Sequence, residues 1–342
     1  MLELVLILTG GFGWWFWENR KRRTHAVSPG YQPSIELPHE QEFELYHNAF
    51  SLCSKKIRVC MAELDLDYES HPIDLIETGS YETLSRHFLA INPEGTVPVL
   101  LHHGHPVYES HEQIRYAADH AGEGSESLVP EEEERSREMQ LWVDRASLTG
   151  DNPILAMAES AGNCVPGITL PLFCSMLKEI PIRRILVGLL FHRLRFRPFL
   201  FLLMKAAGLG RLAKIKPLAQ TIERSIQHMN RHLDDLETQL EKSQGPWILG
   251  DFFSLADISW VVIFDRMREA DFADVFLGEG RRERVAAYRD NLFARESYSR
   301  GIWNHEHPTV RRGTERLREA KANDPGLVAL LGDSIATREK SA

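Results

Sequence analysis

Cysteine is scarce in this chain of 342 residues, which has only four. Four cysteines are too few for a disulfide scaffold, and their spacing matches no zinc ribbon or finger, so we expect reduced thiols and no metal site. No apolar run reaches the roughly 20 residues that cross a bilayer as a helix. With 43% apolar and 26% charged residues, the chain is neither wholly disordered nor collagen-like, and its length suits two ordinary domains.

Acidic residues are absent from one long stretch, residues 180–222, which holds nine Lys or Arg. The first 24 residues are also basic, with a net charge of +2, whereas the whole chain carries −9. The remainder is therefore strongly acidic, which argues against nucleic acid as a partner. The two basic stretches, both flanked by apolar residues, point instead to contact with anionic membrane lipid.

The first 23 residues combine an apolar run, Leu4 to Trp17, with a basic cluster that follows it. A secretory signal has the opposite order, with its positive charges first. The positive-inside rule would put the cluster and everything after it in the cytoplasm. We therefore predict an N-terminal membrane-anchor helix over residues 1–23, spanning or lying on the membrane, and a location at the cytoplasmic face of a membrane. The proline-containing residues 24–41 would be a linker.

Strands and helices alternate from Phe43 onward, in the order β-α-β-α-β-β-α, which predicts an α/β domain over residues 42–123. After Ser136 only helical periodicity is found, which predicts an all-α helical domain over residues 134–322. We expect a basic apolar insertion at about residues 160–218 and a polar tail over 323–342. The clearest helix has an apolar stripe formed by Ile222, Ile226, Met229, Leu233, Leu236 and Leu240.

Two motifs in the α/β region lie directly before a regular element, one before a strand and one before a helix. The run NPEGTVPVL, from Asn92 to Leu100, brings Pro98 to the start of a strand. The run YES, from Tyr108 to Ser110, precedes a helix, so Ser110 is an N-cap candidate. Free backbone amides at the start of a helix bind anions. The second motif therefore predicts a site for an anionic group.

A third motif, NAFSLCSKKIRV, follows the first strand. Ser51 and Cys53 lie at a predicted helix N-terminus, where free amides and the helix dipole stabilise a thiolate. Three basic residues follow closely: Lys55, Lys56 and Arg58. No second cysteine stands at CxxC spacing, which argues against a dithiol mechanism.

The order of elements and these motifs together resemble the glutathione transferase superfamily, over residues 43–122 and 225–299. The resemblance implies an α/β thioredoxin-like N-terminal domain followed by an all-α C-terminal domain, with glutathione as co-substrate. It implies a cis peptide before Pro98 and backbone hydrogen bonds between Val97 and the cysteinyl part of glutathione. Glu109 would bind the ammonium of the γ-glutamyl group, and Ser110 would bind its carboxylate.

The resemblance leaves two mechanisms open. In zeta-class transferases the catalytic serine falls on Ser51, whose hydroxyl would stabilise the glutathione thiolate for attack on an electrophile. In bacterial tetrachlorohydroquinone dehalogenases the position of Cys53 is the catalytic thiol, which would attack a glutathionyl conjugate and form a mixed disulfide. The chain also resembles ganglioside-induced differentiation-associated protein-like members, which are membrane-attached.

The basic apolar insertion lies outside the matched regions and has two interpretations. It can lie in the headgroup region of an anionic membrane, or it can form the hydrophobic wall of the electrophile site. Further along, the run FFSLADIS predicts a capping box with Ser254 as N-cap and Asp257 at N3.

We therefore expect an enzyme, a glutathione transferase that activates the glutathione thiol for attack on a small hydrophobic electrophile. The reaction would be conjugation, or reductive dehalogenation and thiol transfer. The expected partners are glutathione, the electrophile, membrane lipid and a second copy in the family's usual homodimer. The alternative is a non-catalytic glutathione-binding or membrane-shaping protein with a transferase-like fold.

Overall fold

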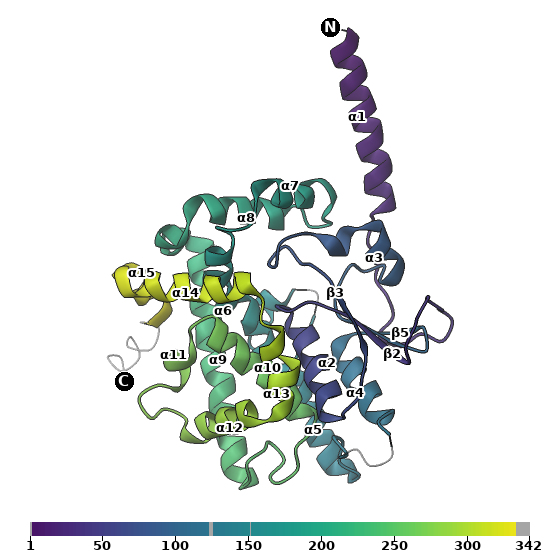
Figure 1. The fold of residues 1–342 in the computed structure, drawn as a ribbon. Coiled ribbons are helices and arrows are strands. Elements are labelled where there is room, and N and C mark those ends of the chain that lie inside the picture. Colours follow the sequence, from purple (N-terminus) through teal and green to yellow (C-terminus); the bar gives the residue numbers. More distant parts are fainter. Residues whose placement is uncertain (1, 123–125, 151, 333–342) are drawn as a thin grey trace.

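A five-stranded sheet with strand order β1-β5-β4-β2-β3 forms the centre of the N-terminal part (Figure 1). The computed structural model describes residues 2–122, 126–150 and 152–332, with side chains from residue 9 onward. The strands are β1 (Gly30–Tyr31), β2 (Phe43–His47), β3 (Glu69–Pro72), β4 (Val99–His102) and β5 (His105–Tyr108). β2 runs parallel to β3 and antiparallel to β4, and β4 and β5 form a hairpin.

The alternation of side chains along the strands divides the sheet between two apolar layers. Three helices supply these layers: α2 (Leu52–Glu63), α3 (Arg86–Ile91) and α4 (Ser110–Asp119). Leu45, Leu100 and Val107 belong to the same core as the buried residues of α2 and α4. Leu101 and Tyr108 pack with α3 in a separate core on the other face.

The rest of the described chain is helical. Its α-helices are α5 (Glu133–Ala146), α6 (Ala161–Met176), α7 (Ile182–Phe191), α8 (Phe196–Ala207), α9 (Lys216–Ser243), α10 (Leu255–Glu269), α11 (Ala273–Leu277), α12 (Glu283–Ala294), α13 (Glu296–Gly301), α14 (Pro308–Asn323) and α15 (Pro325–Gly332). After β5, the residues that the structure describes form no strand, only two isolated β-bridges: Trp247 pairs with Gly250, and Leu249 pairs with Phe252. The predicted order of an α/β part followed by an all-α part is therefore present.

The two parts meet where α2 contacts α10 and α13. α10 begins with the predicted capping box, in which Ser254 is the N-cap and Asp257 closes the box from N3. Every member of the apolar stripe on α9, from Ile222 to Leu240, is buried in the core. Pro166 and Pro171 lie inside α6, and the helix continues through both residues.

Two segments expected to be irregular contain regular structure. The segment expected to be a linker includes β1, which pairs antiparallel with β5 through Gly30 and Tyr108. The start of the segment expected to be a polar tail forms α15, whose Leu327 and Leu331 are buried. Asp324 accepts hydrogen bonds from the first backbone amides of α15. The remaining tail, residues 333–342, lies outside the described residues.

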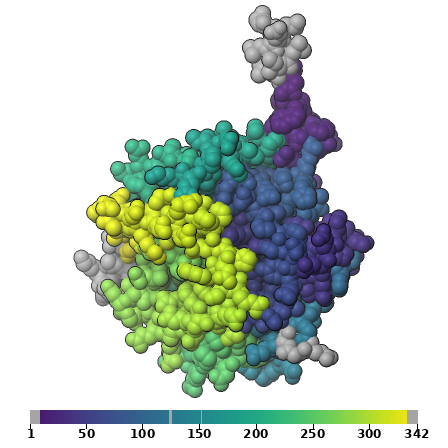
Figure 2. Space-filling view, in the orientation of Figure 1, coloured from purple at the N-terminus to yellow at the C-terminus, as the bar shows by residue number. Residues whose placement is uncertain are grey.

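The prediction of an N-terminal membrane-anchor helix is wrong. Residues 2–21 do form a helix, α1 (Leu2–Lys21), which projects from the body (Figures 1 and 2). However, among the described residues no helix combines the length and the apolar character that crossing a bilayer requires. Three glycines, Gly10, Gly11 and Gly13, and polar residues at its end lower the apolar content of α1. The predicted location at the cytoplasmic face of a membrane, and membrane lipid as a partner, lose their basis with it.

The C-terminal end of α1 is attached to the body. Glu18 forms ion pairs with Arg22 and Arg86, and Arg22 also donates to the backbone carbonyl of Leu84. The indole of Trp15 donates to the carbonyl of Leu190, at the end of α7, over 3.2 Å. Trp15, an aromatic residue of the apolar run expected to be a membrane anchor, therefore contacts the helical part of the body.

Candidate active site

The turn between β2 and α2 holds the first predicted site residue. Ser51 is the N-cap of α2, and its hydroxyl oxygen accepts the backbone N–H of Ser54 at 3.3 Å. The amide oxygen of buried Asn48 accepts the N–H groups of Phe50 and Ser51, at 2.8 and 3.2 Å. Asn48 thereby fixes the turn that presents Ser51 at the positive end of the helix dipole. The Ser51 hydroxyl hydrogen remains available for donation.

Cys53 lies in the first turn of α2 and is partly exposed, whereas the other three cysteines are buried. The buried ammonium of Lys56 interacts electrostatically with Cys53 and Glu109, and both interactions raise its pKa against the larger lowering caused by burial. Lys56 also donates to Ser147 over 3.1 Å. A positive charge beside a cysteine at a helix start favours the thiolate.

The neighbouring basic residues have other roles. The Lys55 ammonium forms ion pairs of 2.6 Å with both Asp265 and Glu269 of α10. Arg58 donates to the carbonyls of Asn48 and Gly301. Of the three basic residues that follow Cys53 in sequence, Lys56 is the one with a recorded electrostatic interaction with it.

The peptide bond between Val97 and Pro98 is cis, as the resemblance implied. Within the described part of the chain, the backbone N–H and C=O of Val97 have no hydrogen-bond partner. The fully buried Gln113 of α4 donates to the carbonyl of Pro98 at 3.0 Å and to that of Val107 at 2.8 Å. Gln113 thus connects this loop to β5 and α4, a role that no local sequence pattern indicated.

Glu109 and Ser110 lie at the start of α4. Glu109, rather than Ser110, is the N-cap, and Ser110 is the first helical residue. Glu109 has a φ of +68°, which is uncommon for a residue with a side chain and is typical of functional positions. Its side chain is exposed and, among the described residues, has no hydrogen bond or ion pair, while Ser110 is buried. An exposed carboxylate beside a helix start suits a ligand that carries both an ammonium and a carboxylate.

A cavity of about 350 Å³ lies between the α/β part and the α7–α8 segment. Two predicted site residues, Ser51 and Val97, line it, whereas Cys53, Pro98, Glu109 and Ser110 do not. The opposite wall comes from α8 and the residues before it: His192, Arg193, Leu194, Arg197 and Phe201. The α7–α8 segment therefore forms a wall of the cavity. In Figure 2 it forms the teal ridge above the α/β part.

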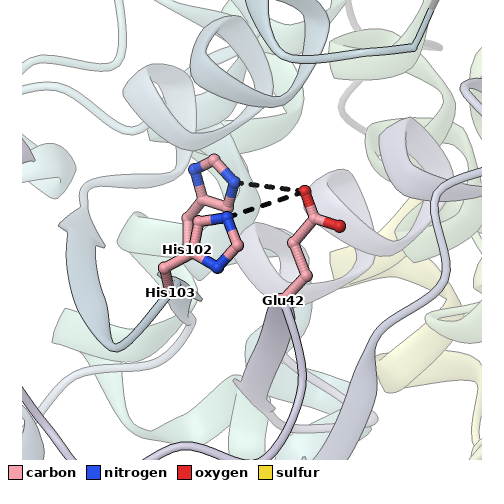
Figure 3. A group of neighbouring side chains, drawn as sticks. All are labelled: Glu42, His102 and His103. Carbon is pink, nitrogen blue, oxygen red and sulfur yellow. Dashed lines mark ion pairs between the residues drawn. The ribbon is translucent and has the colours of Figure 1, made fainter.

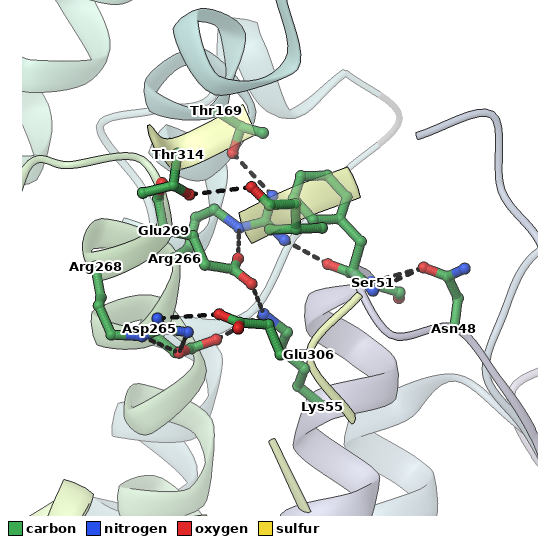
Figure 4. A network of polar contacts seen from close by, with 12 residues as sticks. Asn48, Ser51, Lys55, Thr169, Asp265, Arg266, Arg268, Glu269, Glu306 and Thr314 are labelled. Atoms are coloured by element: carbon green, nitrogen blue, oxygen red, sulfur yellow. Dashed lines mark hydrogen bonds and ion pairs between the residues drawn. The ribbon is translucent and has the colours of Figure 1, made fainter. Parts of the chain in front are cut away.

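A buried polar network supports the Ser51 turn from the helical part (Figure 4). Arg266 of α10 donates to the carbonyl of Phe50, and its guanidinium lies 3.6 Å from the centre of the Phe50 ring. Arg266 also pairs with Glu269 at 3.0 Å, and Glu269 pairs with Lys55. This network fixes α10 against the N-terminus of α2. No sequence pattern indicated this network, because its two sides, the start of α2 and helix α10, are more than 200 positions apart.

One cluster of potential metal ligands lies on the surface, at the β4–β5 hairpin (Figure 3). Glu42 faces His102 at 3.5 Å and His103 at 3.9 Å. Both Glu42 and His103 are exposed, and the Nδ1 atom of His102 is hydrogen-bonded to the Tyr116 hydroxyl at 2.8 Å. Weak surface ion pairing accounts for this arrangement.

Comparison with known proteins gives matches over both parts of the chain. The family described as "Glutathione S-transferase, N-terminal domain" matches residues 50–120, and "Glutathione S-transferase, C-terminal domain" matches residues 219–291. A 2,5-dichlorohydroquinone reductive dechlorinase from Sphingobium indicum is 25% identical over 329 residues, covering 83% of this chain and 90% of the relative. Glutathione S-transferase TCHQD from Arabidopsis thaliana is 24% identical over 268 residues, covering 76% and 89%.

Solved structures share the fold. Beta-etherase LigF from Sphingobium sp. strain SYK-6 has a TM-score of 0.58 at 20% identity, and the match covers 81% of this chain and all of that one. Glutathione transferase F2 from Populus trichocarpa has a TM-score of 0.54 at 19% identity, covering 77% and 98%. At this identity the likeness concerns the fold alone. The α7–α8 segment lies between the two family matches and outside both.

Proposed function

Because the chain is a member of the glutathione transferase superfamily, we propose that it transfers the glutathione thiol to a small hydrophobic electrophile bound in the 350 Å³ cavity. Glutathione is the co-substrate. The observation that supports the proposal most strongly is the position of Ser51 and Val97. A hydroxyl at a helix N-terminus and an unpaired backbone segment line one cavity, and together they suit a cysteinyl thiolate and its flanking peptide groups.

Each part of glutathione has a proposed partner. The Val97 N–H and C=O bind the cysteinyl backbone, beside Pro98. Glu109 binds the γ-glutamyl ammonium, and Ser110 with the first amides of α4 binds the γ-glutamyl carboxylate. The exposed Glu109 carboxylate, which has no ion pair among the described residues, supports this assignment.

We assign the thiol-transfer step to Cys53. The glutathione thiolate first displaces chloride from a chlorinated aromatic carbon, so that a C–S bond forms and a C–Cl bond breaks. The Cys53 thiolate then attacks the sulfur of the conjugate, so that a disulfide bond forms between Cys53 and glutathione and the C–S bond to the ring breaks. The aryl carbon leaves with the electron pair of that bond and takes a proton from water to give the arene. A second glutathione thiolate attacks that disulfide and releases oxidised glutathione. The buried Lys56 ammonium beside Cys53 supports this role.

A second candidate is simple conjugation, in which the reaction stops after the first displacement. The lining of the cavity by Ser51, and not by Cys53, favours it. In that case the Ser51 hydroxyl donates to the glutathione thiolate, and Cys53 has no part in the chemistry.

Assays with glutathione and 2,5-dichlorohydroquinone distinguish the two candidates, since one product is the dechlorinated arene and the other is the conjugate. We expect Cys53→Ala to abolish dechlorination and to accumulate the conjugate, with Ser51→Ala slowing the first displacement. Cys60→Ala is the matched control, because Cys60 lies on the same helix, is fully buried and has a raised thiol pKa. If Cys53→Ala dechlorinates as fast as Cys60→Ala, the Cys53 assignment is wrong.

We also propose that the chain forms a homodimer and that residues 42–123 and 134–322 are its two domains. The family resemblance supports both. Sedimentation of the full chain tests the first proposal, and a monomer at all concentrations would contradict it. Limited proteolysis tests the second, since cleavage should fall first between the two ranges.

A further inference from the structure

The cavity wall supplied by the α7–α8 segment has a chemical character of its own. This segment lies outside both family matches. His192, Arg193 and Arg197 line the cavity opposite Ser51, together with Tyr81 from the α/β part. This inference rests on the proposed function, because it concerns the electrophile that the same cavity holds.

Three of these side chains present hydrogen-bond donors without partners. The Tyr81 hydroxyl is buried and has no hydrogen bond among the described residues. Nδ1 of His192 accepts the backbone N–H of Leu194 at 2.9 Å, so the ring proton of the neutral imidazole is on Nε2, which is free to donate. The Arg197 guanidinium makes no hydrogen bond or ion pair within the described residues.

The donors keep their protons over the working range of pH. Burial, followed by Arg197 and Arg193, lowers the pKa of His192 to about 4, so the imidazole is neutral near pH 7. Burial raises the pKa of Tyr81 far above neutral, so its hydroxyl stays protonated. The Tyr81 and His192 rings pack edge to face, with their centres 5.9 Å apart.

Two carboxylates also line the cavity, and each has a neighbouring cation. Burial, followed by the charge of Glu109, raises the pKa of Glu94, and the charge of Arg193 acts against this rise. Glu77 faces the buried Arg266 as well as Tyr81. Arg197 is exposed, and within the described residues its guanidinium forms no ion pair with either carboxylate.

We propose that Tyr81, His192 and Arg197 form a subsite for an ionised oxygen, so that the electrophile is an aromatic compound carrying a carboxylate or phenolate. Two neutral donors and a guanidinium around one anionic oxygen form charge-assisted hydrogen bonds, which are the strong ones in proteins. The apolar members of the same wall, Leu194 and Phe201, would contact the ring. The subsite orients the reacting carbon by holding the opposite end of the molecule.

A glycine on α7 fits this arrangement. A Cβ at Gly188 would lie 2.5 Å from the Tyr81 ring and 2.7 Å from Pro198, closer than packed atoms come. Only glycine lets α7 approach Tyr81 so closely. Gly188→Ala would therefore separate Tyr81 from the segment that carries His192.

Binding of 3,5-dinitrobenzoate and of its uncharged methyl ester tests the subsite without requiring catalysis. We expect calorimetry to show that the full chain prefers the anion about tenfold. Arg197→Gln should remove that preference, and Tyr81→Phe should reduce it several-fold, while binding of the ester changes less than twofold. Arg195→Gln is the matched control, because it removes the same charge from the same segment and Arg195 does not line the cavity. Equal losses in Arg195→Gln and Arg197→Gln would overturn the proposal.

The glycyl carboxylate of glutathione is the other source of an anionic oxygen, and a second titration separates it from the electrophile. If Arg197 held that carboxylate, Arg197→Gln would weaken glutathione but not glutathione esterified at the glycyl group, and dinitrobenzoate would compete with glutathione. That pattern contradicts the proposal. If the wild-type chain binds dinitrobenzoate through Arg197 but binds no glutathione, the proposed function fails and the subsite stands.

Discussion

Removal of the Lys55 ammonium tests the buried network that fixes α2 against α10. Lys55, Asp265 and Glu269 are almost completely buried, and the ammonium lies 2.6 Å from each carboxylate. Breaking a buried ion pair by removing one partner costs about 3–5 kcal/mol. Asp265 keeps Arg268 at 2.9 Å, and Glu269 keeps Arg266 at 3.0 Å, so we expect Lys55→Met to lower the free energy of unfolding by about 3 kcal/mol, the lower end of that range.

Urea denaturation followed by circular dichroism measures this loss. Arg300→Met is the matched control, because its ion pair with Asp65 is exposed and should contribute less than about 1 kcal/mol. The difference in free energy of unfolding between Lys55→Met and the wild type should shrink as the pH falls toward 4. In the variant a buried carboxylate has lost its cation, and protonation removes its unpaired charge. A loss in Lys55→Met no larger than that in Arg300→Met would refute the reasoning.

Three further predictions concern the site and the core. Gln113→Leu removes the amide that donates to the Pro98 and Val107 carbonyls, so it should lower the free energy of unfolding by about 2 kcal/mol and raise the KM for glutathione, as melting and steady-state kinetics would show. Lys56→Met removes the charge beside Cys53 and should slow alkylation of Cys53 by iodoacetamide several-fold at pH 7, with Cys53→Ala giving the background. Burial raises the pKa of Asp257 to about 6, above its unfolded value. The stability that Asp257 contributes is therefore present below pH 4, and about 3 kcal/mol of it is lost as the pH rises through 6. In Asp257→Asn the free energy of unfolding should not fall with pH in this way.

The sequence was sufficient where the pattern is local. Alternating strands, the helix start at Ser51 and the capping box at Ser254 all depend on residues a few positions apart, whereas the cis peptide before Pro98 was implied by the family resemblance. The N-terminal anchor failed because an apolar run rich in aromatic residues fits both a membrane interface and a helix end attached to the body. Trp15 is an example of attachment to the body, since its indole donates a hydrogen bond to a carbonyl of α7.

Contacts between distant segments could not be predicted. Nothing in the spacing of Lys55, Lys56 and Arg58 indicated that Lys55 pairs with α10 and that Arg58 donates to Gly301 of α13, since both contacts depend on how distant helices pack. Tyr81 and Arg197 line the same cavity because α7 and α8 fold back over the α/β part, and the chain between them includes α5, α6 and α7. The insertion had two interpretations until its place in the fold was known.

Titration of the full chain with glutathione tests the central claim most directly. We predict that one glutathione binds per chain and that Glu109→Gln, which removes the carboxylate assigned to the γ-glutamyl ammonium, weakens binding at least tenfold. Glu112→Gln, one turn along the same helix and outside the proposed site, should leave the affinity unchanged. No heat of binding in the wild-type chain, or equal affinities in both variants, would contradict the account.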